Sequence, residues 1–201
     1  MTKFFFSLRT FTHLSYNLGI ILCIFIWNSS FPVKAQMPER NPQWAEPIYK
    51  PQNLYRINDK LFRSSQPIEE NLSMLQELGI KTVLSLRAFH SNHALLKNSG
   101  IKLIQVKIYT WNIKDKQVVA ALRALKAAES NGPVLLHCQH GADRTGLISA
   151  MYRILYQNWS REQALEELRK GGYGHHSMWK NIPKYLRTVD IEKIRSLVEQ
   201  P

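Results

Sequence analysis

The most informative segment of the sequence is residues 137–146, which read His137-Cys138-Gln139-His140-Gly141-Ala142-Asp143-Arg144-Thr145-Gly146. Before it stands Val134-Leu135-Leu136, a short apolar run typical of a buried strand, and after it an amphipathic helical pattern covers 147–156. The segment is therefore expected to form a glycine-containing loop between the carboxyl end of a strand and the first turn of a helix. In α/β sheets, ligands bind at that place.

The loop carries side chains suited to binding and attacking a phosphate group. Backbone N–H groups of a tight loop and of a helix amino terminus converge on an anion, and the same positive field stabilises a thiolate at Cys138. Arg144, six residues later, can return across the loop and grip two phosphate oxygens with its planar fork. Gly141 permits a sharp turn, and Thr145 is placed to donate a hydroxyl hydrogen bond to the sulfur. The pattern predicts a nucleophilic cysteine in a phosphate-binding loop.

Strand and helix patterns alternate on the amino-terminal side of this loop. Short β-rich runs occur at 61–64, 81–86 and 101–108, and helical patterns occur at 68–79, 92–99 and 115–130. After residue 145 the pattern is helical only, over 147–156, 161–170 and about 178–199, with breaks expected near Pro183 and Asp190. Strands separated by helices predict a single α/β domain with a mostly parallel central sheet flanked by helices.

The composition is that of a globular protein with a basic surface. The 201 residues are 44% hydrophobic and 21% charged, and 27 Lys and Arg against 15 Asp and Glu give a formal net charge of +12. This charge favours anionic partners, although no basic run with interleaved aromatic residues marks a nucleic-acid site. With two cysteines and no zinc-ligand spacing, neither a disulfide scaffold nor a zinc module organises the fold.

The first 35 residues have the pattern of an export signal. Lys3 and Arg9 precede an uncharged apolar run from Leu18 to Trp27, and Val33-Lys34-Ala35 offers small side chains where an export peptidase reads them. We interpret 1–35 as a signal peptide, 36–53 as an irregular Pro-rich leader and 54–201 as the folded domain. The predicted location is secreted or periplasmic. The alternative is an uncleaved membrane anchor over residues 10–33, whose first part is too polar for a good span.

After cleavage the chain would keep one cysteine, Cys138, because Cys23 lies in the signal. Lone thiols are a liability in an oxidising export compartment. The interpretation we favour is that Cys138 is kept for its chemistry, and a buried, inert thiol is the alternative.

The loop resembles the C-x-x-x-x-x-R-[ST] loop of the cysteine-dependent protein tyrosine and dual-specificity phosphatases, and the whole pattern H-C-x-x-G-x-x-R-T-G is similar to theirs. Leu61-Phe62-Arg63-Ser64-Ser65-Gln66-Pro67 also resembles the opening of the small atypical dual-specificity phosphatases of plant, fungal and bacterial type. The resemblance covers most of residues 54–190. It implies a protein tyrosine phosphatase-like fold, attack of the Cys138 thiolate on phosphorus and a cysteinyl-phosphate intermediate that water hydrolyses. It implies no metal and no cofactor.

The resemblance also implies a general acid, supplied by an Asp from a mobile loop before the nucleophile strand. Asp115 is the residue that fits, 23 residues before Cys138, although an Asp at a helix start also serves as a cap. Asp143, inside the loop, subtracts from its positive potential and disfavours polyphosphorylated substrates. His137 is expected to orient Cys138 by a hydrogen bond. The predicted catalytic residues are Cys138, Arg144, Asp115 and Thr145, and the predicted substrate-binding residues are His137, Gln139, His140, Gly141, Ala142, Asp143, Arg144 and Arg87.

These residues predict a monomeric, metal-independent phosphomonoester hydrolase acting on phosphotyrosine or phosphoserine/threonine in proteins, or on a small phosphomonoester. Inositol phosphates and phospholipids are alternative substrates. A third enzyme alternative, an RNA 5′-triphosphatase, is opposed by the export signal, and no nucleic-acid partner is expected. A catalytically idle phosphate-binding module is disfavoured because Cys138, Arg144, Thr145 and Asp115 are all present. A membrane association is expected only if the amino-terminal segment stays uncleaved.

We predict that the exported protein begins at Gln36, because Val33-Lys34-Ala35 directly precedes it. N-terminal sequencing of protein from an extracytoplasmic fraction measures this. A chain that starts at Met1 and stays in the membrane fraction would support the anchor instead.

Overall fold

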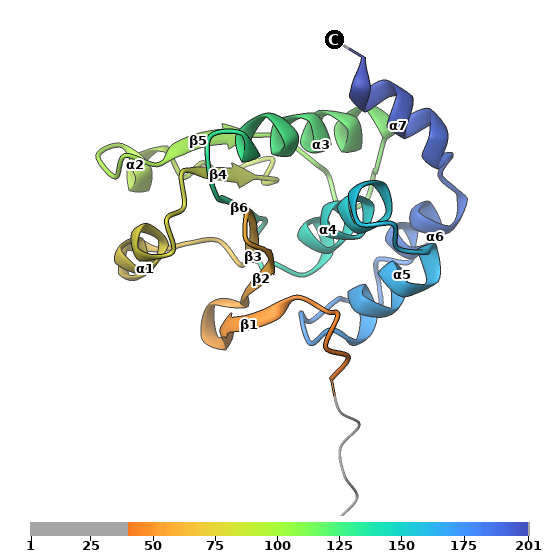
Figure 1. Cartoon of the computed structure of the whole chain (residues 1–201), viewed down its shortest axis with the longest axis horizontal. Helices are drawn as coiled ribbons and strands as arrows, with labels where there is room; N and C mark the ends of the chain where they lie inside the picture. The colour runs from red at the N-terminus through yellow and green to blue at the C-terminus, as the bar shows by residue number, and fades with distance from the viewer. Residues whose placement is uncertain (1–39, 201) are drawn as a thin grey trace, which may run out of the picture. The chain divides into compact units, whose positions relative to one another are not determined.

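Strand β6 (Val134–His137) lies in the interior of a six-stranded sheet whose order is β1-β2-β3-β6-β4-β5 (Figure 1). The computed structural model describes residues 40–200. The other strands are β1 (Glu46–Tyr49), β2 (Leu54–Asn58), β3 (Leu61–Ser64), β4 (Thr82–Ser85) and β5 (Lys102–Gln105). Strands β3, β6, β4 and β5 are parallel, and β1 and β2 are added antiparallel at one edge.

The register of the central strands brings their carboxyl ends to one level. His137 of β6 pairs with Ser64 of β3 on one side and with Ser85 of β4 on the other. All residues of β3, β4 and β6 are buried. The segments that follow these three strands, which begin at Ser65, Leu86 and Cys138, therefore start next to one another at the same edge of the sheet.

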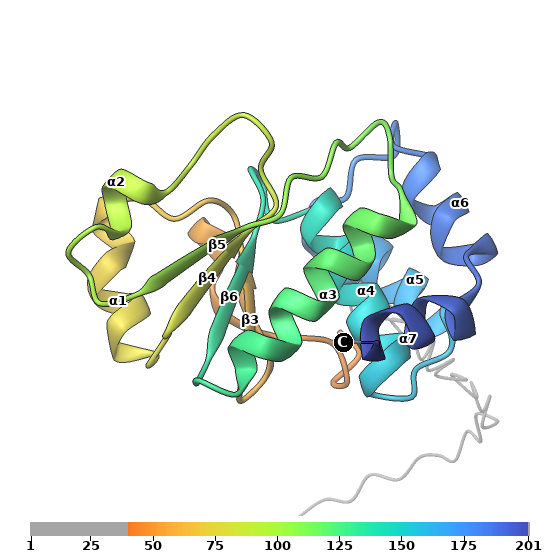
Figure 2. The ribbon, with the colours of Figure 1, turned by 90° about the horizontal axis from the view of Figure 1, so that it is seen from above.

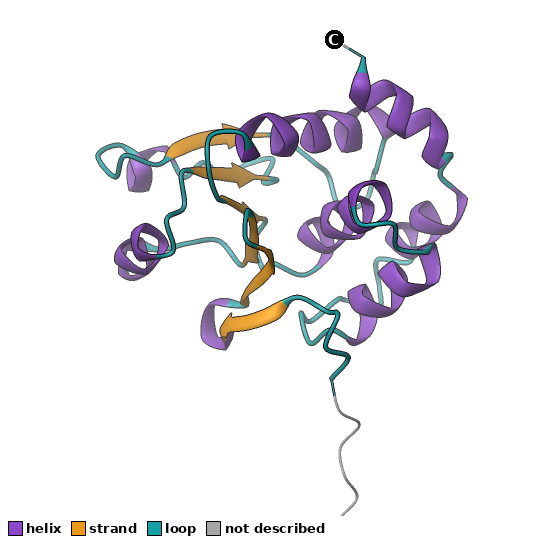
Figure 3. Ribbon diagram, viewed as in Figure 1, coloured by secondary structure: helices purple, strands orange, loops and turns teal. Residues whose placement is uncertain are grey.

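Helices cover both faces of the sheet (Figures 2 and 3). One face carries α1 (Leu72–Glu77) and α2 (His93–Leu96), and the other carries the five longer helices. Those five are α3 (Asp115–Glu129), α4 (Asp143–Tyr156), α5 (Arg161–Lys170), α6 (Asn181–Thr188) and α7 (Ile191–Glu199), and two short 3-10 turns, η1 (Lys50–Gln52) and η2 (Glu69–Asn71), complete the elements. Within residues 40–200, no helix combines the length and apolar character needed to cross a bilayer.

Successive side chains of β6 point to opposite faces of the sheet and enter two different hydrophobic cores. Leu135 packs into the smaller core under α1 and α2, whereas Val134 and Leu136 pack into the larger core under the other helices. A strand buried on both faces has a continuous apolar sequence. The apolar run Val134-Leu135-Leu136 predicted β6 for this reason. The predicted fold class, a single α/β domain with a mostly parallel sheet between helices, is confirmed.

The prediction of an irregular leader over 36–53 is wrong where β1 and η1 form. Strand β1 pairs antiparallel with β2, and Ala45 just before it is 1% exposed. The prolines suggested an irregular segment, but an edge strand tolerates Pro47 because one of its backbone N–H groups need not pair with another strand. Residues 1–39, which include the predicted signal peptide and the start of the leader, lie outside the described residues.

Two expected helix breaks have different outcomes. Asp190 separates α6 from α7 as predicted, and its carboxylate accepts the N–H of Lys193 at 3.0 Å as a helix cap. Pro183 breaks nothing, because α6 begins at Asn181 and Pro183 falls in its first turn. The missing N–H of a proline removes no helical hydrogen bond there.

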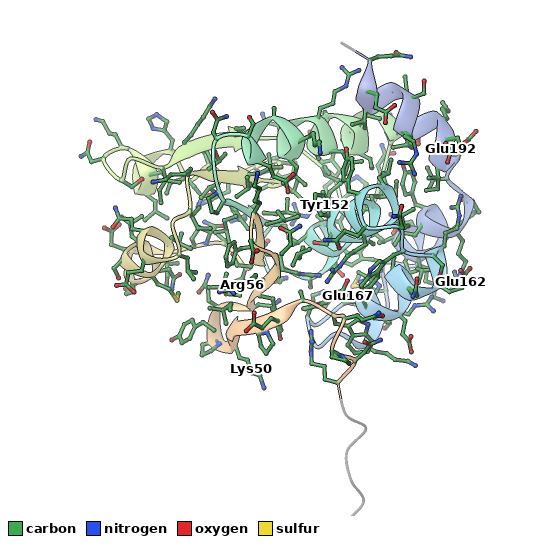
Figure 4. All side chains as sticks on the ribbon, viewed as in Figure 1. Lys50, Arg56, Tyr152, Glu162, Glu167 and Glu192 are labelled. Atoms are coloured by element: carbon green, nitrogen blue, oxygen red, sulfur yellow. The ribbon has the colours of Figure 1, made fainter. Side chains whose placement is uncertain are left out.

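The carboxylate of Glu167, a residue labelled in Figure 4, is a buried charge of α5 that contacts Arg153, Ala45 and Tyr173. Its two oxygens accept both Nε and Nη2 of Arg153, each at 2.9 Å, and the two side chains are 4% and 5% exposed. Oε1 also accepts the N–H of Ala45 at 2.7 Å and the hydroxyl of Tyr173 at 2.9 Å. Burial opposes ionisation of Glu167, but Arg153 outweighs it and lowers the pKa of the carboxyl.

We predict that Glu167→Gln lowers the free energy of unfolding by ~3–5 kcal/mol, because it leaves Arg153 buried without its charge partner. Glu166→Gln is the matched control, since Glu166 forms only an exposed pair with Lys170 and should change stability by less than about 1 kcal/mol. Urea denaturation measures both variants.

The pH dependence of stability provides a second readout for the same pair of variants. A depressed carboxyl pKa contributes stability that is present above the unfolded-state pKa and lost as the pH falls through the folded-state pKa. The wild type and Glu166→Gln should therefore lose more stability on acidification than Glu167→Gln. Equal losses in all three proteins would show that the buried pair carries no such stability.

Candidate active site

Hydrogen bonds hold the backbone carbonyl groups of the loop after β6. The carbonyl oxygens of Gln139, His140 and Gly141 each accept a hydrogen bond from another segment, and that of Cys138 accepts Nδ1 of His137 at 2.8 Å. The three outside donors are the N–H of Gln66 at 3.0 Å, Nδ2 of Asn53 at 2.8 Å and Nη2 of Arg63 at 2.8 Å.

The backbone N–H groups of the same loop, unlike its carbonyl groups, are not engaged in hydrogen bonds within residues 40–200. In the described part of the chain, the N–H groups of residues 139–142 donate to no backbone or side-chain acceptor. Helix α4 begins at Asp143, so its amino terminus adds further free N–H groups and the positive end of its dipole. With carbonyl oxygens held away and N–H groups free, the loop is arranged to bind an anion.

Gly141 gives the loop its path. Its φ of +71° favours glycine, and a Cβ built there would lie 2.5 Å from the carbonyl carbon and oxygen of Ser64. The loop therefore passes directly against the end of β3. Only a residue without a side chain allows this approach.

Arg63 is a site residue that the sequence reasoning did not single out. It lies in β3, is 1% exposed, and its guanidinium stands 3.6 Å from the centre of the Tyr173 ring while it holds the Gly141 carbonyl. Burial lowers the pKa of Arg63, although nearby Tyr173 and Glu167 oppose this. The available signal was a charged residue inside an otherwise buried strand, which is rare without a dedicated partner.

A cavity of about 370 Å³ opens beside the loop. Five of its polar residues come from the loop, from the start of α4 and from the segment after β4, and the rest of its wall is largely aromatic. Phe89 and Trp111 are 82% and 62% exposed at its rim. The ring of Tyr109 packs at a tilt against both, with its centre 5.7 Å from that of Phe89 and 5.3 Å from that of Trp111. The lining residues are Arg87, Ala88, Phe89, Ile108, Tyr109, Thr110, Trp111, Gln139, His140, Asp143, Arg144, His176, Met178 and Trp179.

The structure brings most of the predicted substrate-binding residues together. Arg87, Gln139, His140, Asp143 and Arg144 line the cavity. Arg87 donates to the side-chain oxygen of Gln66, and burial together with the neighbouring Arg144 lowers its pKa. Cys138 and Ala142 are 2% and 1% exposed within the same loop. The predicted phosphate-binding residues thus form one contiguous site.

His137 is buried and neutral. Burial lowers its pKa to about 4. The carbonyl oxygen of Cys138 only accepts, so Nδ1 carries the proton and donates it. Nε2 is then an acceptor, and it is buried without a partner among the described residues.

The hydrogen bond predicted from Thr145 to the cysteine sulfur is absent. Thr145 is fully buried in the first turn of α4, and its hydroxyl has no hydrogen-bond partner within residues 40–200. The sequence spacing placed Thr145 near the sulfur but could not fix the direction of the hydroxyl.

Asp143 faces two histidines from the segment after α5. Its Oδ2 lies 2.7 Å from Nδ1 of His176, and its Oδ1 accepts the backbone N–H of His176 at 3.0 Å. Nδ1 of His175 is 2.9 Å from Oδ1, although outside hydrogen-bond geometry. Burial opposes ionisation of Asp143, but these histidine contacts outweigh it and lower the pKa. The Asp143 carboxylate is therefore held by the segment that carries His176, which the sequence did not reveal.

Asp115 is not brought to the cavity. It is the first residue of α3, and its oxygens contact the hydroxyl of Tyr185 at 3.0 Å and Nζ of Lys193 at 3.1 Å. The preceding loop reaches the cavity instead through Tyr109, Thr110 and Trp111, none of which is a carboxylate. The role of Asp115 as general acid stays a prediction without supporting geometry.

Together, a buried cysteine at the end of a central parallel strand, a loop with free N–H groups and an arginine six residues later define the class of cysteine-dependent phosphatases. A model of the tyrosine phosphatase family matches residues 48–195. This chain belongs to the tyrosine phosphatase family.

Individual relatives agree with this assignment. The dual specificity protein phosphatase TpbA of Pseudomonas aeruginosa is 35% identical over 178 residues, which are 89% of this chain and 81% of TpbA. A crystal structure of TpbA in complex with pTyr has a TM-score of 0.75 at 36% identity and covers 81% of this chain and all of that one.

The inositol diphosphatase SIW14 of Saccharomyces cerevisiae is a second relative. It is 35% identical over 132 residues, which are 61% of this chain and 46% of SIW14. Its catalytic domain in complex with citrate has a TM-score of 0.65 at 29% identity and covers 75% of this chain and 93% of that one. The chain is a phosphatase by fold and family.

We predict that Gly141→Ala lowers kcat/KM by about 100-fold or more, since displacement of the loop by even 1 Å misplaces its N–H groups. Gly100→Ala is the matched control: Gly100 has a φ of +74°, but nothing lies within 4 Å of its added Cβ. The control should lose about 1–2 kcal/mol of stability and no activity. Equal losses of activity would show that backbone strain alone, rather than contact with Ser64, causes the effect.

Proposed function

We propose that this protein hydrolyses phosphomonoesters through a cysteinyl-phosphate intermediate, with phosphotyrosine-containing proteins as its preferred substrates. The observation that carries the proposal is the loop itself, whose carbonyl oxygens are tied back while the N–H groups of residues 139–142 are free. Preorganised N–H donors stabilise the charge of a phosphoryl group in flight at no cost of reorganisation.

In the proposed mechanism, the sulfur of Cys138 attacks phosphorus and forms an S–P bond while the ester P–O bond breaks. The departing oxygen takes a proton from a general acid. Water then attacks the cysteinyl phosphate and gives a proton back to the deprotonated general acid. The S–P bond breaks, inorganic phosphate is released, and the thiolate is restored. Arg144 binds two of the phosphoryl oxygens in both steps.

The shape of the cavity supports an aryl phosphate. Its rim is built from Phe89, Tyr109 and Trp111, and aromatic rings pack well against a phenyl ring. Arg87 and Arg144 are the permanent cations among its lining residues, and Asp143 adds a negative charge. A single phosphate on an aromatic ring fits this better than a ring of phosphates. Inositol phosphates are the second candidate, favoured by the activity named for SIW14 and its plant relatives.

We propose that the enzyme acts outside the cytoplasm as a monomer. The support is the export pattern of residues 1–35, which lie outside the described residues. Phosphorylated proteins or small phosphomonoesters are the proposed partners.

His176 is the group that we propose as proton donor. It lines the cavity, and its Nδ1 is held by Asp143 at 2.7 Å. Nε2 has no hydrogen-bond partner among residues 40–200, so in the imidazolium form it carries a proton that is available for transfer. A carboxylate that fixes one ring nitrogen orients the other. Asp115, in contrast, is occupied by Lys193 and Tyr185.

We predict that Cys138→Ser lowers kcat by about 10⁴-fold or more, because the serine hydroxyl is a far weaker nucleophile, while phosphopeptide binding persists. Phosphate release and calorimetric binding measure the two effects. In the wild type, assays without added metal on a phosphotyrosyl peptide, a phosphoseryl peptide and an inositol polyphosphate should rank the phosphotyrosyl peptide first in kcat/KM. A first rank for the inositol polyphosphate would replace the proposed substrate but not the mechanism.

We predict that His176→Gln lowers kcat by about 100-fold for an alkyl phosphate and much less for a p-nitrophenyl phosphate, whose phenolate leaves without a proton. Asp115→Asn is the comparison variant and should change kcat little for either substrate. Steady-state kinetics on both esters decides between them. If instead Asp115→Asn shows the dependence on leaving group and His176→Gln does not, Asp115 is the acid.

A further inference from the structure

A second cleft lies behind the segment that carries His176. It has a volume of about 420 Å³, within the range of small-ligand sites. The end of α5, helix α6 and the segment between them form its wall, and these helices lie side by side (Figures 1 and 2). Its lining residues are Arg169, His175, Ser177, Lys180, Pro183 and Arg187.

The segment 175–180 is a wall shared by the two sites. His175, Ser177 and Lys180 line the second cleft. The residues between them, which are His176, Met178 and Trp179, line the catalytic cavity. The second cleft is therefore separate from the catalytic loop but adjoins it.

The charge of the second cleft is uniformly positive. Arg169, Lys180 and Arg187 contribute one permanent charge each, and no carboxylate lines the cleft. Within residues 40–200, none of the three forms an ion pair, whereas Arg153 and Lys193 both pair with carboxylates. Three cations around one cleft repel each other, and a bound anion relieves that repulsion.

The hydrogen-bonding groups of the cleft are those that recognise phosphate. Two guanidinium forks match the spacing of phosphate oxygens, and the ammonium and the hydroxyl of Ser177 add donors. The side chain of His175 is 6% exposed, and its Nδ1 lies 2.9 Å from Oδ1 of Asp143. The donors available to an anion are therefore those of Arg169, Ser177, Lys180 and Arg187.

We propose that this cleft binds a compact polyanion that carries adjacent phosphate groups, of the pyrophosphate class. Two linked phosphates bring about three negative charges near neutral pH, which matches the three cations. The proposal does not depend on the catalytic role of Cys138. His175 lines the second cleft, His176 lines the catalytic cavity, and both contact the carboxylate of Asp143. Asp143 therefore lies between the bound ligand and the catalytic cavity.

Titration calorimetry with inorganic pyrophosphate tests the proposal on the full chain carrying Cys138→Ser, so that no turnover occurs. Two binding sites are expected in this background. Adding Arg169→Gln, Lys180→Gln and Arg187→Gln together should leave one site, with the second weakened at least tenfold. Adding Arg144→Ala instead should remove the other site and leave the cleft intact.

The matched control removes the same charge elsewhere, with Lys60→Gln, Lys97→Gln and Lys116→Gln at three exposed positions that line neither site. It should retain both sites. If the control loses as much affinity as the cleft variant, or the cleft variant keeps both sites, the proposal fails. If Arg144→Ala changes nothing, the catalytic loop assignment fails instead. Should the triple variant not fold, Arg187→Gln alone is expected to weaken the same site, and unchanged binding would overturn the proposal.

Discussion

The contact on which the active site ultimately depends is the buried pair between Glu167 and Arg153. Tyr173 donates its hydroxyl to this carboxylate, and its ring supports the guanidinium of Arg63 at 3.6 Å. Arg63 in turn holds the carbonyl of Gly141. A chain of charge and hydrogen bonds thus runs from α4 and α5 to the catalytic loop. A buried network of this kind holds its members in fixed positions, so contacts with the core hold the loop in place.

This rigidity has a chemical purpose. An anion site made of backbone N–H groups works only if the intervening carbonyl oxygens point elsewhere, since a single inward carbonyl would repel phosphate. Donors from two parts of the chain, Asn53 before β2 and Arg63 and Gln66 in and just after β3, enforce that arrangement. The aromatic rim around Tyr109 comes from a different part of the chain. The loop and the rim of the cavity are therefore built on separate elements.

Sequence patterns predicted the parts whose determinants are local. The apolar runs of β3, β4 and β6 and the loop from Cys138 to Arg144 were readable because each is set by neighbouring residues. Strand β1 was missed because prolines mask an edge strand whose existence depends on β2. Position relative to the cavity is a tertiary property, so spacing alone could not show that Asp115 faces Lys193 or that His176 returns to Asp143 across 33 residues.

The anchoring of Ala45 has a consequence for the order of folding. Its N–H is bound by Glu167, 122 residues later in the chain, and β1 can add to the sheet only beside β2. Ala45 lies just before β1, and yet its partner Glu167 belongs to α5. Contacts so distant in sequence close slowly, because the loop entropy must be overcome before they form. The contact between Ala45 and Glu167 can therefore form only after α5 has been synthesised.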